Sequence, residues 1–162
     1  MKIFFFRHGE KQNDFNSDPQ LTVRGHQQAQ KIAQSVQLGL LPQPQRLFAS
    51  PAVRAQQTLL PLSKFLLLPL VTDPRLEQRS VHESSTDFHH RIQSFLQFLT
   101  TPPTEADCIF FVSHVDWLTD SLDLLPKTKN ISRVELSHWR PAMYAYFQFT
   151  NGTFELQDVK NV

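Results

Sequence analysis

Arginine and histidine side chains stand at the ends of apolar runs in this 162-residue chain. Arg7 and His8 directly follow the first apolar run, and His114 follows a late one. Arg54 lies one turn into the helix that is predicted after a third apolar segment. A guanidinium group binds phosphate oxygens through paired hydrogen bonds, and an uncharged imidazole can attack phosphorus to form a covalent intermediate. These residues therefore indicate phosphate chemistry if the fold brings them together.

The apolar runs predict strands that carry these side chains to one edge of a sheet. Short runs bounded by turn signals predict buried strands over residues 2–6, 46–49 and 108–112, and a less regular one over 68–71. Ligands of α/β domains bind beyond the carboxyl ends of parallel strands. If the three strands are neighbours, two arginines and two histidines converge on that edge.

Helical spacing of apolar residues fills the segments between the strands. Helices are predicted from Thr22 as a cap, from Ser50-Pro51, over residues 85–99 and over about 117–125. Pro61 predicts a kink or break near Leu60. Asn151-Gly152 predicts a hairpin between strands at 142–149 and 153–156. The pattern predicts an α/β three-layer α/β/α sandwich with a mostly parallel, mixed-edge sheet, in a single domain over residues 1–162.

Composition limits the class of protein. Hydrophobic residues make up 40% and charged residues 19%, as in an ordinary soluble domain. The net charge of +1 gives no field that favours nucleic acid or a membrane surface, so neither is expected as a partner. Cys108 is the single cysteine, which excludes an internal disulfide. No signal-peptide core or apolar run of membrane-spanning length is present, so we expect a cytoplasmic protein.

Four motifs together resemble the histidine phosphatase superfamily, also called phosphoglycerate mutase-like. They follow the family's order and cover residues 1 to about 120, and the short chain is most similar to the small SixA-like phosphohistidine phosphatase branch. The motifs are Arg7-His8-Gly9-Glu10, Leu21-Thr22-x-x-Gly25-x-x-Gln28-Ala29, Ser50-Pro51-x-x-Arg54-Ala55-x-Gln57-Thr58 and Val112-Ser113-His114.

The resemblance implies a role for each matched residue. His8 would be the nucleophile that becomes phosphorylated, and water would then hydrolyse the intermediate. Arg7 and Arg54 would clamp the phosphoryl oxygens, with His114 completing the pocket. Asn13, in the polar loop after the first motif, is a further candidate for phosphate binding. No metal and no other cofactor is expected, because cationic side chains would neutralise the developing charge.

The sequence departs from the family pattern most clearly at the general acid. Lys11 and Val115 replace the usual threonine and glycine, and Gln78 stands where many members carry a glutamate. Glu77 and, more remotely, Glu83 remain candidates for that acid. An alkoxide leaving group, with a pKa near ~15.7, needs an acid, whereas an imidazole leaving group, with a pKa of about 6.5, does not. The sequence therefore favours phosphohistidine or another phosphoramidate as substrate.

Three functions from different classes remain open at this point. The first is a phosphatase for a phosphorylated protein of the histidine phosphotransfer type. The second is a phosphomonoesterase or mutase for a small phosphorylated metabolite, although the chain lacks the insertions of mutases. The third is a noncatalytic phosphate-binding module that keeps the clamp without turnover.

Overall fold

A six-stranded mixed sheet forms the centre of the computed structural model, which describes residues 1–13, 17–100, 108–127 and 138–162. The strand order is β3-β2-β4-β1-β5-β6. Strands β1 to β4 pair in parallel, whereas β5 pairs antiparallel with β1 and with β6. This arrangement confirms the mostly parallel sheet with a mixed edge. The strands are β1 (Lys2–Arg7), β2 (Arg46–Ala49), β3 (Leu70–Thr72), β4 (Cys108–Ser113), β5 (Tyr144–Thr150) and β6 (Thr153–Lys160).

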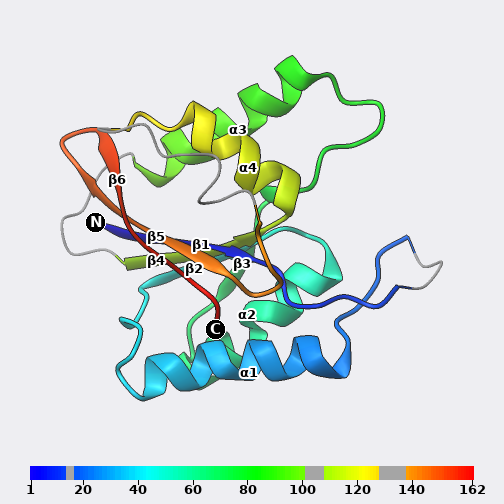
Figure 1. Cartoon of the computed structure of the whole chain (residues 1–162), viewed down its shortest axis with the longest axis vertical. Helices are drawn as coiled ribbons and strands as arrows, with labels where there is room; N and C mark the ends of the chain where they lie inside the picture. The colour runs from blue at the N-terminus through cyan, green and yellow to red at the C-terminus, as the bar shows by residue number, and fades with distance from the viewer. Residues whose placement is uncertain (14–16, 101–107, 128–137) are drawn as a thin grey trace.

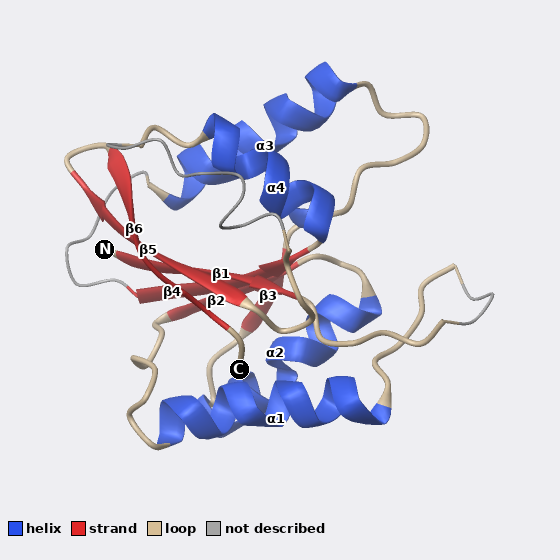
Figure 2. Ribbon diagram, in the orientation of Figure 1, coloured by secondary structure: helices blue, strands red, loops and turns tan. Residues whose placement is uncertain are grey.

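Helices cover both faces of the sheet and complete the predicted three layers (Figure 1, Figure 2). Helices α1 (Val23–Gln37) and α2 (Val53–Leu66) lie on one face. Helices α3 (Ser85–Leu99) and α4 (Val115–Leu124) lie on the other, and a short 3-10 turn, η1 (Pro74–Leu76), follows β3. None of the helices within the described ranges is long and apolar enough to cross a membrane.

Strand β1 is buried on both faces of the sheet, as expected for a central parallel strand with a continuous apolar run. Phe4 and Phe6 pack into the hydrophobic cluster beneath α1 and α2. Phe5 packs into the opposite cluster with α3 and α4. Its ring centroid lies 4.4 Å from that of Phe111 on β4. The strand that ends in Arg7 is therefore held by packing from both layers.

Two local predictions differ from the structure. Of the kink or break that Pro61 predicts near Leu60, the break is wrong, because α2 runs as one helix from Val53 to Leu66. Leu59 and Leu62, on either side of the proline, are fully buried, and this packing outweighs the hydrogen bond that proline cannot make. The last strand is also longer than predicted, since it continues to Lys160.

Candidate active site

The two histidines of the site stand at the carboxyl ends of neighbouring parallel strands. The register pairs Arg7 of β1 with Ser113 of β4, so that His8 and His114 are the next residues along each strand. The backbone N–H of His8 donates to the carbonyl of Ser113 at 3.2 Å. The imidazole centroids are 5.3 Å apart. The sheet thus brings together two residues that are more than a hundred positions apart in the sequence.

His8 is held as a neutral imidazole with a defined tautomer. Its side chain is buried, and its Nδ1 lies 2.8 Å from the carbonyl oxygen of Gly9. A carbonyl can only accept, so Nδ1 carries the proton and Nε2 keeps its lone pair. Burial, together with the nearby charges of Arg54 and Arg7, lowers the pKa of His8 to about 4. The side chain is therefore in the form that a nucleophile at phosphorus requires.

Arg54 connects the second histidine to the loop after η1. The Arg54 residue is only 4% exposed. Its Nη2 donates to Nδ1 of His114 at 3.2 Å and to Oε1 of Gln78 at 2.8 Å. Nε2 of His114 then donates to the hydroxyl of Ser50 at 2.9 Å. Burial and the positive charge of Arg54 lower the pKa of His114 to about 2. Both imidazoles are therefore uncharged beside two guanidinium groups.

Asp18 supplies a carboxylate at the amino end of α2. Its oxygens accept the backbone N–H of Val53 at 3.0 and 3.1 Å and a bond from Nη1 of Arg54 at 3.3 Å. A carboxylate at a helix N-terminus satisfies a free backbone donor and interacts well with the helix dipole. Asp18 thereby fixes the side of the Arg54 guanidinium that does not face His114. The sequence reasoning did not single out Asp18.

Arg7 is held by the turn that precedes β5. Its Nη1 donates to the carbonyl of Trp139, and the N–H of Ala142 donates to the carbonyl of His8 at 3.1 Å. Ala142 adopts a φ of 60°, a left-handed conformation that costs about 1–2 kcal/mol for a residue with a side chain. Such strain persists only where its surroundings impose it. The turn before β5 thus holds both the Arg7 side chain and the His8 backbone.

Both arginines keep a donor for a further ligand. Nε of Arg7 and Nε of Arg54 are buried and have no hydrogen-bond partner in the described part of the chain. A buried donor without a partner costs about 1–3 kcal/mol. A phosphoryl group has several oxygens that can accept hydrogen bonds from guanidinium groups. This observation favours an anion site between β1 and α2.

Motif residues without a predicted role hold the backbone of the first two motifs. The hydroxyl of Thr58 accepts the N–H of Gly9 at 2.9 Å, and the side-chain oxygen of Gln28 accepts the N–H of Glu10 at 2.8 Å. Gln57 accepts the N–H of Leu21 in the same way. Their place in the quoted motifs was the only sequence feature that pointed to a role for them. Each of them satisfies a backbone donor that strand pairing leaves free.

Gly25 allows α1 to touch this loop. A Cβ atom at Gly25 would lie 2.1 Å from the carbonyl oxygen of Glu10. Thr22, the cap of α1, also donates its hydroxyl proton to the carboxylate of Glu10 at 2.8 Å. Gly25 and Thr22 of the second motif therefore set how closely α1 packs against Glu10 of the first motif.

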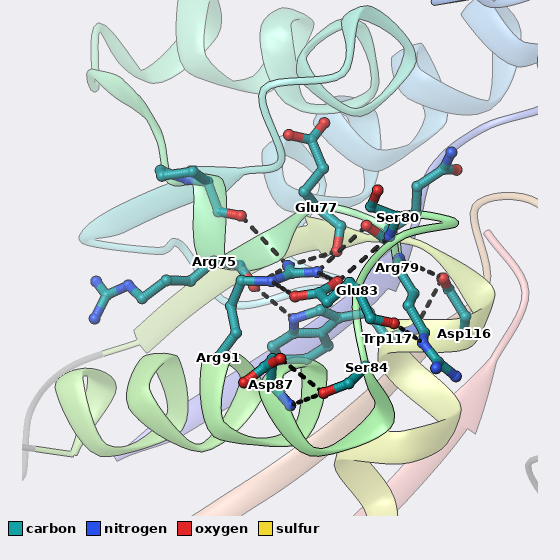
Figure 3. Close-up of polar contacts among 12 residues, drawn as sticks. Arg75, Glu77, Arg79, Ser80, Glu83, Ser84, Asp87, Arg91, Asp116 and Trp117 are labelled. Atoms are coloured by element: carbon teal, nitrogen blue, oxygen red, sulfur yellow. Dashed lines mark hydrogen bonds and ion pairs between the residues drawn. The ribbon is translucent and has the colours of Figure 1, made fainter.

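The predicted acids occupy different environments. Glu83 accepts two hydrogen bonds from the Arg91 guanidinium, which lowers the pKa of its carboxyl and keeps it ionised. Glu77 is half-buried, and its carboxylate points away from Arg91 (Figure 3). Burial lowers the pKa of Arg54, and the negative charge of Glu77 opposes this effect. Gln78 rather than either acid makes the contact with Arg54. Asn13 is exposed in the loop after β1.

The amino-terminal part of the chain matches a known protein family. The family model for histidine phosphatase superfamily (branch 1) matches residues 3–82, just under half of the chain, which include Arg54 and the first three of the four motifs. A search among curated proteins finds no match.

Solved structures of several phosphatases share the fold over nearly the whole chain. The protein histidine phosphatase SixA, complexed with tungstate, is 20% identical with a TM-score of 0.76, over 99% of this chain and 97% of that one. Phosphoserine phosphatase from Entamoeba histolytica, in complex with 3-phosphoglyceric acid, is 16% identical with a TM-score of 0.77, over 99% and 97%. A candidate alpha-ribazole-5'-P phosphatase from Escherichia coli is 18% identical with a TM-score of 0.82, over 100% and 97%.

Proposed function

We propose that this protein is a phosphatase that uses His8 as its nucleophile and acts on phosphohistidine in a protein. The observation that carries the proposal is the state of His8. Its ring is neutral, its Nδ1 is bound to the Gly9 carbonyl, and its Nε2 lone pair is available beside Arg7, Arg54 and His114. The fold that it shares with several phosphatases supports the same class of reaction.

The reaction would consist of two displacements at phosphorus. Nε2 of His8 attacks, a P–N bond forms, and the bond to the leaving group breaks with its electron pair going to the leaving atom. Water then attacks phosphorus, the P–N bond breaks, the electron pair returns to His8 and the proton of the water passes to solvent. Arg7 and Arg54 stabilise the charge on the phosphoryl oxygens during both steps, which is why no metal is invoked.

The surroundings of Arg54 favour a leaving group that needs no acid. An amide, from Gln78, lies 2.8 Å from its guanidinium, and the carboxylate in contact with it among the described residues is that of Asp18, which also binds the α2 N-terminus. A phosphohistidine that carries a proton on its other ring nitrogen leaves as neutral imidazole. We therefore infer a phosphorylated protein of the histidine phosphotransfer type as partner, in the cytoplasm.

A small phosphorylated metabolite is the second candidate substrate. Glu77 favours it, because its charge acts on Arg54 and its carboxylate is not engaged by Arg91. If the loop brought Glu77 to the leaving oxygen, the site would have the acid that an ester requires. Asn13 would then be an additional phosphate ligand from the adjacent loop.

Trapping the phosphoenzyme tests the nucleophile. Brief incubation with a ³²P-labelled phosphohistidine protein, followed by quenching at alkaline pH, should leave acid-labile label on the wild-type protein and none on His8→Ala. His26→Ala, at an exposed histidine of α1, is the matched control and should be labelled like the wild type. Label that persists in His8→Ala would overturn the assignment.

A substrate panel tests the leaving group. A phosphorylated histidine-containing phosphotransfer domain should be hydrolysed with a kcat/KM at least about a hundredfold above that of alkyl phosphomonoesters, in line with the ~10²–10⁴-fold worth of a general acid. Comparable values for the two substrates would exclude the phosphohistidine assignment and favour the metabolite.

A further inference from the structure

The segment from Pro74 to Glu83 is folded around one guanidinium group, that of Arg91 on α3 (Figure 3). Nε and Nη2 of Arg91 donate to the two carboxylate oxygens of Glu83 at 2.8 and 2.7 Å. Its Nη1 donates to the carbonyls of Glu77 at 2.8 Å and Arg75 at 3.1 Å, and its Nη2 also donates to that of Gln78 at 3.3 Å. One side chain thus binds both ends and the middle of the segment.

The Arg91–Glu83 pair is fixed more firmly than an ordinary surface ion pair. The side chains are only 20% and 17% exposed. The guanidinium lies over the ring of Phe88 at 4.9 Å, and Phe88 is fully buried in the core. The two parallel N–H···O bonds require a planar fork, which lysine does not have. The Arg91–Glu83 pair therefore anchors the segment to α3.

Other contacts of the segment leave Gln78 between two anchors. On one side, the hydroxyl of Ser113 donates to the carbonyl of Leu76 at 2.7 Å. On the other, the N–H of Arg79 donates to the carboxylate of Asp116 at 2.7 Å. Gln78, between them, reaches Arg54 at 2.8 Å.

We propose that Arg91 is a positioning residue of the candidate active site, which holds residues 77–83 through the carboxylate of Glu83 and the carbonyls of Glu77 and Gln78, so that Gln78 lies against Arg54. It touches no group that reacts, and it acts through Gln78. Its positive charge also lowers the pKa of His114, after the larger effects of burial, Arg54 and His8. The kinetic part of this inference rests on the proposed function.

Hydrogen exchange tests the positioning without any turnover. In Arg91→Met, the backbone amides of Arg79, Ser80 and Glu83 should exchange faster, on the order of tenfold or more, because their segment has lost its charged anchor. The buried amides of α3 should keep their protection. Unchanged exchange over residues 77–83 would overturn the proposal whether or not the protein proves to be a phosphatase.

Arg75→Met is the matched control. Arg75 also pairs with a carboxylate, that of Asp73 at 2.6 Å, and also lies over a phenylalanine of α3, Phe98, at 4.5 Å. Its side chain donates to Asp73 and Ser94, outside residues 77–83. This variant should leave exchange in that segment at the wild-type rate.

A double-mutant cycle tests whether Arg91 acts through Gln78. Arg91→Met should lower kcat/KM by on the order of 10- to 100-fold, as expected when a positioned group is displaced by about 1 Å. In the Gln78→Ala background the same change should cost no more than about twofold, since coupled residues are not additive. Arg91→Lys should restore the net charge. It should recover less than half of the loss in log kcat/KM, because lysine lacks the planar fork of donors.

The outcomes separate the two proposals. Full additivity of Arg91→Met and Gln78→Ala, or complete rescue by Arg91→Lys, would overturn the positioning role while the phosphatase assignment stood. An inactive wild-type protein whose segment 77–83 still loosens in Arg91→Met would overturn the proposed function while the positioning stood.

Discussion

Under the proposed function, Gln78 would determine which leaving group the site can serve. Its amide oxygen accepts a hydrogen bond from Arg54, at the position where the family pattern predicts a carboxyl group. An amide has no proton to give at neutral pH, whereas a protonated carboxyl does. A single substitution therefore changes the chemistry of the site without changing its shape, because glutamine and glutamate are close in size.

Gln78→Glu should create activity toward alkyl phosphomonoesters. The contact with Arg54 favours the ionised form of the new carboxyl and lowers its pKa, so the gain should increase as the pH falls from 7 toward 5. We expect a rise in kcat of about tenfold near pH 5, less than the ~10²–10⁴-fold of a well-tuned acid. The measurement is kcat against pH for an alkyl phosphate.

Gln78→Ala is the control for this substitution, and it should show no gain at any pH. The activity of Gln78→Glu toward the phosphohistidine protein should stay at or below the wild-type value, because that leaving group needs no acid. An equal gain on both substrates would contradict the role assigned to Gln78.

At the scale of elements, the loop from Arg7 to Glu10 depends on how closely α1 approaches it. A methyl group at Gly25 would meet the Glu10 carbonyl at 2.1 Å, and backbone cannot yield as a flexible side chain can. Gly25→Ala should reduce the free energy of unfolding by about 1–3 kcal/mol and shift His8 relative to Arg54. We expect a fall in kcat of tenfold or more, on the order seen for small misplacements of reacting groups.

Gly39→Ala, just beyond the other end of α1, is the matched control for Gly25→Ala. The added methyl group meets nothing within 4 Å there, but the residue has a φ of 71°. It should cost about 1–2 kcal/mol from the left-handed conformation and leave kcat unchanged. Chemical denaturation and steady-state kinetics on both variants would separate the two effects.

The sequence was sufficient for the elements that carry the site, because they follow strong local signals. The buried run of β1 and the Thr22 cap of α1 lie where the patterns predicted them. The break considered at Pro61 does not occur, since burial of Leu59 and Leu62 depends on neighbours that no local pattern contains. Asp18 contacts α2 across 35 residues of sequence, and Arg91 reaches back 8 to 14 residues into an irregular loop, so no helical or strand spacing could reveal either contact.

At the scale of the molecule, two buried neutral histidines make stability depend on pH. The pKa of His8 is about 4 and that of His114 about 2, whereas an unfolded histidine titrates near ~6.5. Between about pH 6.5 and pH 4 the unfolded chain binds more protons, so the free energy of unfolding falls as the pH is lowered. Each group contributes up to ~1.4 kcal/mol per pH unit within this window.

His8→Asn should remove about half of this dependence. Urea denaturation at pH 6.5 and pH 4.5 should show a smaller loss of stability for the variant than for the wild type. His26→Asn, at an exposed histidine of α1, should lose as much as the wild type. Equal losses in all three proteins would mean that His8 is not held neutral by the fold.

The place of β1 in the sheet also governs when the protein can fold during its synthesis. β1 is made first, yet its neighbours are β4 and β5, which end at residues 113 and 150. At ~5–20 residues per second, the ribosome needs roughly 7–30 s to make the last of them after β1 has emerged. Until β4 has been made, Phe4, Phe5 and Phe6 have no neighbouring strand to pair with, and the second neighbour, β5, follows only later. His8, at the end of that strand, is thus translated among the first residues, long before the second strand that flanks β1 exists.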